Sequence, residues 1–332
     1  MAKRGIVVVS GASAGIGRAT ARRFAQAGWS VAVLARGTDG LQGAVREIEG
    51  CGARAMAIPL DVADEAAVEA AADRVEREWG PIDVWVNNAM VTAYCEFMDM
   101  SSQDFRRATE VTYFGSVWGM RAALKRMLAR DRGTVVQVGS ALAYRSIPLQ
   151  SAYCGAKSAL RGFIDSVRSE LLHRRSKVRV TMVQLSAFNT PQFDWGKTCI
   201  PKQPQPVPPI FQPEVAAEGI YHAALHPRRE LWVGWPAVKA ILAQKFIPGI
   251  LDRILAKEGY DGQHTDDPLP PGRRDNLYEP VPGDHGAHGR FDARSKPYSA
   301  QLWLDLNRTL LLGAVALLIG VRGGMALARR LK

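Results

Sequence analysis

The sequence predicts an α/β fold in which a doubly wound parallel β-sheet carries helices on both faces. Up to about residue 190, short runs rich in Val and Ile alternate with longer amphipathic runs, the pattern of strand–helix–strand units. The short runs are apolar almost throughout, as strands buried on both faces are. The first run leads directly into a glycine-rich turn. A chain of 332 residues that is 47% hydrophobic and 23% charged is long and apolar enough for a substantial core.

Seven strands are predicted, with a short and weakly marked seventh: 6–10, 30–35, 53–59, 82–87, 133–139, 177–185 and 230–233. A helix is predicted to begin near Ile16, directly after the glycine turn. Apolar side chains at helical spacing predict a longer helix from Ser151 to about His173, with its apolar stripe in the core.

Composition divides the chain into three segments. Residues 1–258 form the predicted globular domain, in which the proline-rich stretch 201–213 is expected to be an irregular loop that covers a cleft. Residues 259–300 are polar and rich in Gly and Pro, which predicts a linker. Its histidines, His264, His285 and His288, lack spaced partners, so we expect solvated side chains and no metal site. Residues 301–332 are predicted to form an apolar and basic C-terminal helix.

The net charge of +11 is spread along the chain without a zinc-finger, basic-zipper or RNA-binding pattern, so nucleic acid is not a predicted partner. Dinucleotide phosphates, and acidic lipid near the basic C-terminus, account for the charge more simply. The four cysteines are far apart and form no CxxC pair. They indicate neither a zinc site nor a disulfide framework, and they fit a reducing, cytoplasmic compartment.

Gly11, Gly15 and Gly17 form a GxxxGxG turn between the first strand and the first helix. Glycines let a backbone approach a pyrophosphate, and a helix N-terminus offers free N–H groups and a favourable dipole. An ordinary glycine-rich turn is the alternative, but the order of strand, glycines and helix favours a dinucleotide site. The expected cofactor contacts are Gly11, Ser13, Ala14, Gly15, Ile16, Gly17 and Arg18.

The second strand ends in Arg36, where an acidic residue would bind the adenosine ribose and repel a 2′-phosphate. A guanidinium matches phosphate in charge and geometry, and we expect Arg18 to assist it. The sequence therefore predicts NADP(H), with NAD(H) as the alternative if Arg36 only faces solvent. Asp61 and Val62 after the third strand are expected at the adenine. Asn87, Asn88 and Ala89 after the fourth are expected to frame the cofactor.

Ser140, Tyr153 and Lys157 have the chemistry for hydride transfer. A tyrosine can protonate a carbonyl oxygen if its pKa of about 10 is lowered, and Lys157 lies one helical turn away. Its ammonium would favour the phenolate and hold the nicotinamide ribose, while the Ser140 hydroxyl would bond the substrate oxygen. A packed tyrosine beside a surface lysine is the alternative, and it explains neither Ser140 nor the glycine turn.

With these motifs the chain closely resembles the short-chain dehydrogenase/reductase family over residues 4–195, and the resemblance extends to about residue 257. The matching residues are Gly11, Gly15, Gly17, Asp61, Asn87-Asn88-Ala89, Ser140, Tyr153 and Lys157. The resemblance implies one Rossmann-type domain with strand order 3-2-1-4-5-6-7 that assembles as a dimer or tetramer. It also implies reversible oxidation of a small-molecule alcohol, or reduction of a carbonyl, with Tyr153 as acid and base.

Three positions depart from the family pattern. Met90 replaces the glycine of Asn-Asn-Ala-Gly, and Thr112 stands where the family has an asparagine that holds a water in a proton relay. The Pro-Gly pair after the sixth strand is replaced within Leu185–Thr190, although Thr190 remains to meet the cofactor. These departures argue for a divergent subgroup of enzymes.

The run Leu310–Val321 is apolar and is followed by Arg322 and a basic end. Counted across Arg322, it reaches the roughly 20 residues needed to span a bilayer. A spanning tail would send basic residues outward, against the positive-inside tendency, whereas a helix lying in the inner leaflet with snorkelling arginines avoids that conflict. Membrane attachment through 301–332 and packing against protein both remain open.

Two functions follow from the sequence. The first is an NADP(H)-dependent oxidoreductase of a lipophilic alcohol or ketone, indicated by apolar residues near the predicted cleft: Met90, Tyr94, Leu142, Ile147, Phe188, Phe193 and Trp195. The second is a dinucleotide-binding regulatory or scaffold protein without turnover. Thr112 and Met90 favour the second, and the intact Ser140, Tyr153 and Lys157 count against it.

Overall fold

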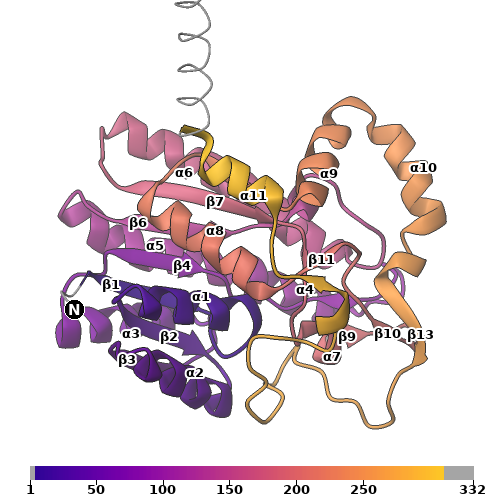
Figure 1. The fold of residues 1–332 in the computed structure, drawn as a ribbon, viewed down its shortest axis with the longest axis horizontal. Coiled ribbons are helices and arrows are strands. Elements are labelled where there is room, and N and C mark those ends of the chain that lie inside the picture. The colour runs from indigo at the N-terminus through magenta and orange to yellow at the C-terminus, as the bar shows by residue number, and fades with distance from the viewer. Residues whose placement is uncertain (1–3, 310–332) are drawn as a thin grey trace, which may run out of the picture.

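The centre of the molecule is a seven-stranded sheet in which every pair of neighbours is parallel (Figure 1). The structure is a computed structural model and describes residues 4–309. The strands are β1 (Ile6–Ser10), β2 (Ser30–Ala35), β3 (Ala55–Pro59), β4 (Val84–Asn87), β6 (Thr134–Val138), β7 (Arg179–Leu185) and β12 (Glu230–Val233). They lie in the order β12-β7-β6-β4-β1-β2-β3. The predicted fold class, strands and strand order are confirmed.

Helices cover both faces of this sheet. One face carries α1 (Gly15–Gln26), α2 (Thr38–Gly50) and α8 (Pro213–Leu225), and the other carries α3 (Glu65–Trp79), α5 (Gly115–Ala129) and α6 (Ser151–His173). Alternate β1 side chains enter opposite cores: Val7 clusters with Phe24 of α1, and Val8 with Leu160 of α6. The predicted long helix is α6, with the predicted bounds. The helix α4 (Ser102–Thr109) and a π-helical turn (Glu110–Phe114) lead into α5.

The strand order reverses at β1, which has β2 on one side and β4 on the other. In open parallel sheets, ligands bind at such a switch point, beyond the carboxyl ends of the strands. The loops that follow β1 and β4 therefore meet at the position where the sequence predicts a cofactor.

Residues 259–300 are predicted as a linker, but they pack across the sheet domain. After α9 (Trp235–Phe246) and α10 (Pro248–Glu258), β13 (His264–Pro268) pairs with β10 (Lys202–Pro204), and β14 (Ser295–Lys296) pairs with β11 (Ile210–Phe211). The helix α11 (Ala300–Leu306) then lies on α8 and β12 (Figure 1). The polar segment is anchored by hydrogen bonds and by a few buried side chains, Leu277 and Phe291 among them. The proline-rich stretch 201–213 is ordered by the same pairings.

Two cysteines form a disulfide that the sequence does not predict. The short strands β5 (Ala93–Tyr94) and β9 (Lys197–Thr198) pair in parallel, which brings the residues that follow them, Cys95 and Cys199, together. Their Cα atoms are 4.9 Å apart, although 104 positions separate them in the chain. The expectation of no disulfide is therefore wrong for this pair. Cys51 and Cys154 are free.

No helix within residues 4–309 has the length and hydropathy to cross a bilayer. The predicted tail segment 310–332 lies outside the described residues.

Candidate functional site

The glycine turn after β1 is shaped so that side chains cannot replace its glycines. Gly11 and Gly15 have φ values of +66° and +58°. A Cβ atom at Gly17 would lie 2.1 Å from the Gly11 carbonyl oxygen, and one at Gly11 would lie 2.7 Å from the Cα atom of Ala89. Helix α1 begins behind this turn without a side-chain cap and without an acidic residue in its first turn. The positive dipole end of α1 suits an anion, so the pyrophosphate of a dinucleotide fits this turn.

Asn88 fastens the loop after β4 to the glycine turn. Its Nδ2 group donates to the carbonyl oxygens of Ser10 and Gly11 at 3.1 and 3.2 Å. The Ser10 hydroxyl in turn accepts from the backbone N–H groups of Asn88 and Ala89 at 3.0 and 3.2 Å. Asn88 and Ala89 thereby form one wall of the cleft at the switch point.

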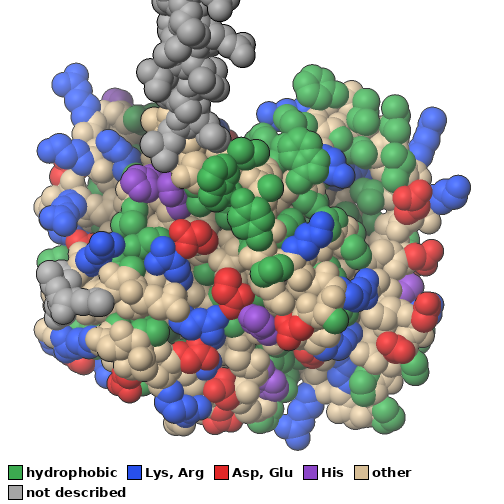
Figure 2. Space-filling view, in the orientation of Figure 1, with side chains coloured by type: hydrophobic (Ala, Val, Ile, Leu, Met, Phe, Trp, Pro, Cys, Tyr) green, Lys and Arg blue, Asp and Glu red, His purple; other side chains and the backbone are tan. Residues whose placement is uncertain are grey.

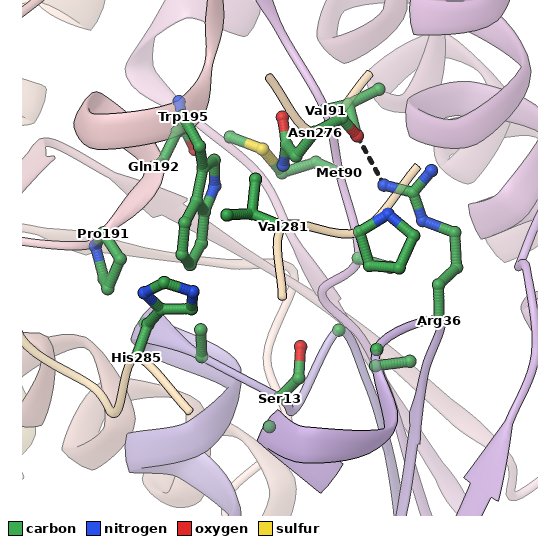
Figure 3. Close-up of a pocket in the computed structure, with 18 of the residues that line it drawn as sticks. Ser13, Arg36, Met90, Val91, Pro191, Gln192, Trp195, Asn276, Val281 and His285 are labelled. Atoms are coloured by element: carbon green, nitrogen blue, oxygen red, sulfur yellow. Dashed lines mark hydrogen bonds between the residues drawn. The ribbon is translucent and has the colours of Figure 1, made fainter. Parts of the chain in front are cut away.

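A cleft runs from the glycine turn across the ends of β2 and β3 (Figure 3). Most of the predicted cofactor residues line it: Gly11, Ser13, Ala14, Gly15, Ile16, Arg36, Asp61, Val62, Asn88, Ala89 and Thr190. Gly17 packs behind the turn. Figure 3 shows Trp195 and His285 facing each other on one side of the cleft and Arg36 on the other side.

The outer wall of this cleft comes from the C-terminal extension, in a segment that we call the strap (residues 273–291). Pro280, Val281, Gly283 and His285 line the cleft. The Gly286 carbonyl oxygen accepts the N–H of Gly15 in the glycine turn at 3.0 Å. Sequence patterns do not predict this wall, because its polar composition is typical of a linker and its partners lie far away in the chain.

Arg18 does not take the predicted position at the cofactor phosphates. Its side chain is 2% exposed and donates to the carbonyl oxygens of Ser13 and Gly40 at 3.0 and 2.8 Å. It also pairs with Glu47 at 3.0 Å and with Asp284 of the strap at 3.1 Å. The expected phosphate role is therefore corrected: Arg18 joins the glycine turn, α2 and the strap, because a buried guanidinium must satisfy its donors.

Arg36 lies in the cleft at the end of β2, and the strap holds its side chain. Its Nη1 atom donates to the Tyr278 carbonyl oxygen at 2.6 Å and to that of Leu277 at 3.4 Å, and Nη2 donates to Asn276. Burial lowers the pKa of Arg36, but a guanidinium stays charged. Neighbouring Asp61 accepts from Arg107 and from the Ala63 N–H.

Ser140, Tyr153 and Lys157 are all buried and come together at the end of β6 and the start of α6. The Lys157 Nζ atom donates to the Val138 carbonyl oxygen at 2.8 Å and lies 5.6 Å from the centre of the Tyr153 ring. The Ser140 Oγ atom accepts the Leu142 N–H at 3.1 Å. Ser140 and Tyr153 line a second cavity.

Burial sets the protonation of Tyr153 and Lys157. Burial raises the pKa of Tyr153 far above its ordinary value, and a hydrogen bond with Ser140 offsets only part of that rise. Burial also lowers the pKa of Lys157 to about 8. The sequence predicts that Lys157 lowers the pKa of Tyr153. In the protein without a ligand, the cost of charging a buried phenol is larger, so Tyr153 is held as a neutral acid.

Thr112 and Met90, two of the departures from the family pattern, differ in their position. Thr112 is fully buried in the π-helical turn, where its hydroxyl donates to the Val91 carbonyl oxygen at 2.9 Å and accepts the Val91 N–H at 3.2 Å. Thr112 therefore secures the loop after β4 and lines neither cavity, contrary to its expected place at the reacting centre. Met90 lines both cavities.

The second cavity is mainly apolar and has a volume of about 350 Å³, within the usual range for small-molecule sites. The proline-rich loop lines it through Pro206, Val207 and Pro208, as its expected role as a cover requires. Met90 and Thr190 also line the cleft at the glycine turn, which we call the dinucleotide cleft. Six of the seven apolar residues named from the sequence line the cavity: Met90, Tyr94, Leu142, Ile147, Phe188 and Phe193. The seventh, Trp195, lines the cleft instead, and Leu251, Ile254 and Leu255 of α10 were not foreseen.

Known proteins are similar to this chain in sequence. A family model described as short chain dehydrogenase matches residues 5–195. The uncharacterized oxidoreductase YxnA of Bacillus subtilis is 34% identical over 84% of this chain and 79% of its own length. The putative oxidoreductase SadH of Mycobacterium tuberculosis is 31% identical over 76% of this chain and 94% of its own.

Two solved structures also resemble this one. An alcohol dehydrogenase of the archaeon Thermococcus sibiricus, complexed with 5-hydroxy-NADP, has a TM-score of 0.60 at 25% identity and covers 69% of this chain and 95% of its own. The L-sorbose reductase of Gluconobacter frateurii, complexed with NADPH and L-sorbose, has a TM-score of 0.61 over 69% of this chain and 94% of its own. At 22% identity, the second likeness supports the fold alone.

Proposed function

The chain belongs to the short-chain dehydrogenase family, and from that premise we propose an NADP(H)-preferring oxidoreductase that interconverts a lipophilic alcohol and its ketone or aldehyde. One observation carries the proposal. Ser140 and Tyr153 face an apolar cavity that adjoins the dinucleotide cleft, and Met90 and Thr190 belong to the lining of both. A substrate carbonyl in the cavity would thus lie between the proton donor and the cofactor.

Tyr153 is the proposed acid and base. When bound, the nicotinamide cofactor supplies the hydride for reduction or accepts it in oxidation. Because burial raises the pKa of Tyr153, the phenol keeps its proton until negative charge develops on the substrate oxygen. That behaviour suits a general acid in carbonyl reduction.

Ser140 and Lys157 are proposed to orient the reacting groups. The Ser140 Oγ atom accepts the Leu142 N–H, and its one proton bonds the Tyr153 oxygen in the protein without a ligand. We propose that a bound substrate oxygen takes this proton's hydrogen bond in place of Tyr153. Lys157 spends one donor on Val138, and an ammonium has three. Its other donors are available to the nicotinamide ribose hydroxyls and to the Tyr153 oxygen.

Arg36 carries the proposed coenzyme preference. Three of its contacts go to strap carbonyl oxygens, and a guanidinium has five N–H donors, so two remain for a 2′-phosphate. The alcohol dehydrogenase of Thermococcus sibiricus, solved with an NADP derivative, supports the same preference. The strap is proposed as part of this site, because its carbonyl oxygens hold the Arg36 guanidinium in place. NAD(H) is the alternative if the strap carbonyls suffice as partners.

Tyr153→Phe tests the function. The rate of NADPH oxidation should be followed with a panel of apolar ketones and aldehydes. The variant should lose about 10²- to 10⁴-fold in rate with its NADPH affinity little changed, the range attributed to general acid catalysis. Tyr221→Phe is the matched control, because Tyr221 is equally buried but lies on α8 against Phe24. Equal rates for the parent and Tyr153→Phe would refute the assigned role.

A scaffold without turnover is the second candidate. The position of Thr112 favours it, because a hydroxyl bonded both ways to Val91 does not replace the family's asparagine in a water relay. NADPH binding without turnover on any carbonyl of the panel would support this candidate over the enzyme.

A further inference from the structure

Helices α9 and α10 expose an unusual number of large apolar side chains. The exposed residues on the two helices and at Ile247 between them are Trp235, Leu242, Phe246, Ile247, Ile250 and Ile254, with Phe246 at 80% and Trp235 at 56%. Figure 2 shows green side chains gathered over these helices, on the side of the molecule that carries α11. Contiguous exposed apolar patches of this kind mark interaction sites, whereas apolar side chains scattered singly are ordinary surface.

The apolar area continues from α9 onto α11. Trp235 and Leu304 line one shallow hollow in the surface, and the Gly234 N–H donates to the Gln301 side chain at 2.8 Å. Trp303 and Leu304 are about half exposed. We call the exposed apolar side chains of α9, α10 and α11 the docking face.

Basic side chains accompany the docking face. Lys239, Lys245, Arg253 and Lys257 are all exposed on α9 and α10. The acidic residues on the same helices are fewer, and one of them, Asp252, is paired with Arg145 at 2.7 Å. Apolar side chains flanked by lysine and arginine are typical of helices that lie in a lipid interface, and anionic headgroups attract the cations.

The chain itself continues toward more apolar sequence at this point. Helix α11 ends at Leu306, and the exposed Arg308 and Thr309 follow. The next residues in the sequence begin the apolar run Leu310–Val321. An apolar segment is thus joined covalently to the docking face.

We infer that the docking face binds the surface of an anionic lipid bilayer. A second copy of the chain is a poorer occupant, because a symmetric contact would bring the basic side chains of the two faces toward each other. Ile254 belongs both to the docking face and to the wall of the second cavity. If the proposed function holds, a lipophilic substrate could therefore pass between bilayer and cavity, but docking itself does not depend on that function.

Vesicle binding by the full chain tests the inference. Phosphatidylcholine vesicles with and without phosphatidylglycerol should be floated with the protein, and amide hydrogen exchange should be measured in both. We expect flotation with the anionic vesicles, weakened by salt, together with exchange protection in α9 and α10. The double variant Phe246→Glu, Ile250→Glu should lose that protection and bind at least about tenfold more weakly.

A matched control is Met98→Glu, Leu172→Glu, because both side chains are apolar and strongly exposed but lie outside the three helices. It should behave as the parent. The inference is overturned if the protein does not float, or if it floats without protection in α9 and α10, which would assign binding to residues 310–332. Protection that appears without vesicles and rises with protein concentration would also overturn it, in favour of a second copy.

Discussion

Lys157 shows how burial controls charge at the candidate site. Burial lowers its pKa to about 8, so its ammonium is largely present below that pH and is lost as the pH rises through it. The charged form is the one proposed to hold the nicotinamide ribose. We therefore predict that kcat/KM for NADPH, which reports groups of the free enzyme, is constant near neutral pH and falls above about pH 8.

Two variants distinguish the titration of Lys157 from other causes of a fall in kcat/KM at alkaline pH. Lys157→Arg keeps its charge at every pH of such a titration, so its residual activity should lack the alkaline fall. Lys157→Met should have a lower kcat/KM for NADPH than the parent at all pH values. A parent profile that stays level through pH 8 would contradict the assignment.

Arg36 makes a prediction about coenzyme choice. In Arg36→Asp, a carboxylate would repel a 2′-phosphate and could accept the hydroxyls of an adenosine ribose. The ratio of kcat/KM for NADPH to that for NADH should fall by about 10- to 100-fold, the range expected for losing a charged hydrogen bond. Arg54→Asp is the control, because Arg54 lies over Trp79 and outside the cleft. An unchanged ratio would remove Arg36 from the coenzyme site.

At the scale of elements, the strap depends on Asp284. This carboxylate accepts from Arg18 at 3.1 Å and from Arg46 at 3.2 Å. Burial opposes its ionisation, but the hydrogen bond and charge of Arg18 outweigh burial and lower the pKa of Asp284. A neutral side chain at this position should loosen the strap over the cleft.

Asp284→Asn is therefore predicted to speed the release of bound NADPH by about tenfold, the effect of losing roughly 1.4 kcal/mol of strap contacts. Stopped-flow fluorescence with excess NADP⁺ as the chase measures the rate. Asp266→Asn serves as the control, because Asp266 of the same extension is fully exposed and forms an ion pair with Lys202, outside the strap. A release rate equal to that of the parent would mean that the strap does not retain the cofactor.

The sheet is predictable from local sequence patterns. The strap is not, because contacts between residues far apart in the chain hold it in place. The Val-rich strands, the stripe of α6 and the glycine turn each depend on neighbours within a few residues. Arg18 occupies a position that suits a phosphate contact, yet its partner Asp284 lies 266 residues away. Cys95 and Cys199 likewise meet only through the pairing of two short strands. Periodicity and spacing carry no signal for such contacts.

Thr112 is another residue whose position could not be predicted from local sequence patterns. The family resemblance puts Thr112 where the family has an asparagine that holds a water, but its hydroxyl bonds depend on how the Val91 loop folds against the π-helical turn. The trio of Ser140, Tyr153 and Lys157 was easier to foresee, because a strand end and one helical turn fix its members locally.

At the scale of the whole molecule, the sheet brings two cavities to one edge. The dinucleotide cleft lies at the switch point between β1 and β4, and the apolar cavity extends from Ser140 toward α10. The proposed docking face includes α10 together with α9 and α11. Cofactor, substrate and lipid surface would thus follow one another across the molecule, with Met90 and Thr190 at the first junction.

Transfer of deuterium is the most direct test of this arrangement. The protein should be incubated with an apolar ketone that it reduces and with NADPH deuterated at the transferable position of the nicotinamide ring. Mass spectrometry of the alcohol should find the deuterium on the carbinol carbon, because the account places that carbon beside the ring with Tyr153 supplying the other hydrogen from solvent. An alcohol without deuterium, or no alcohol from any ketone while NADPH remains bound, would contradict it.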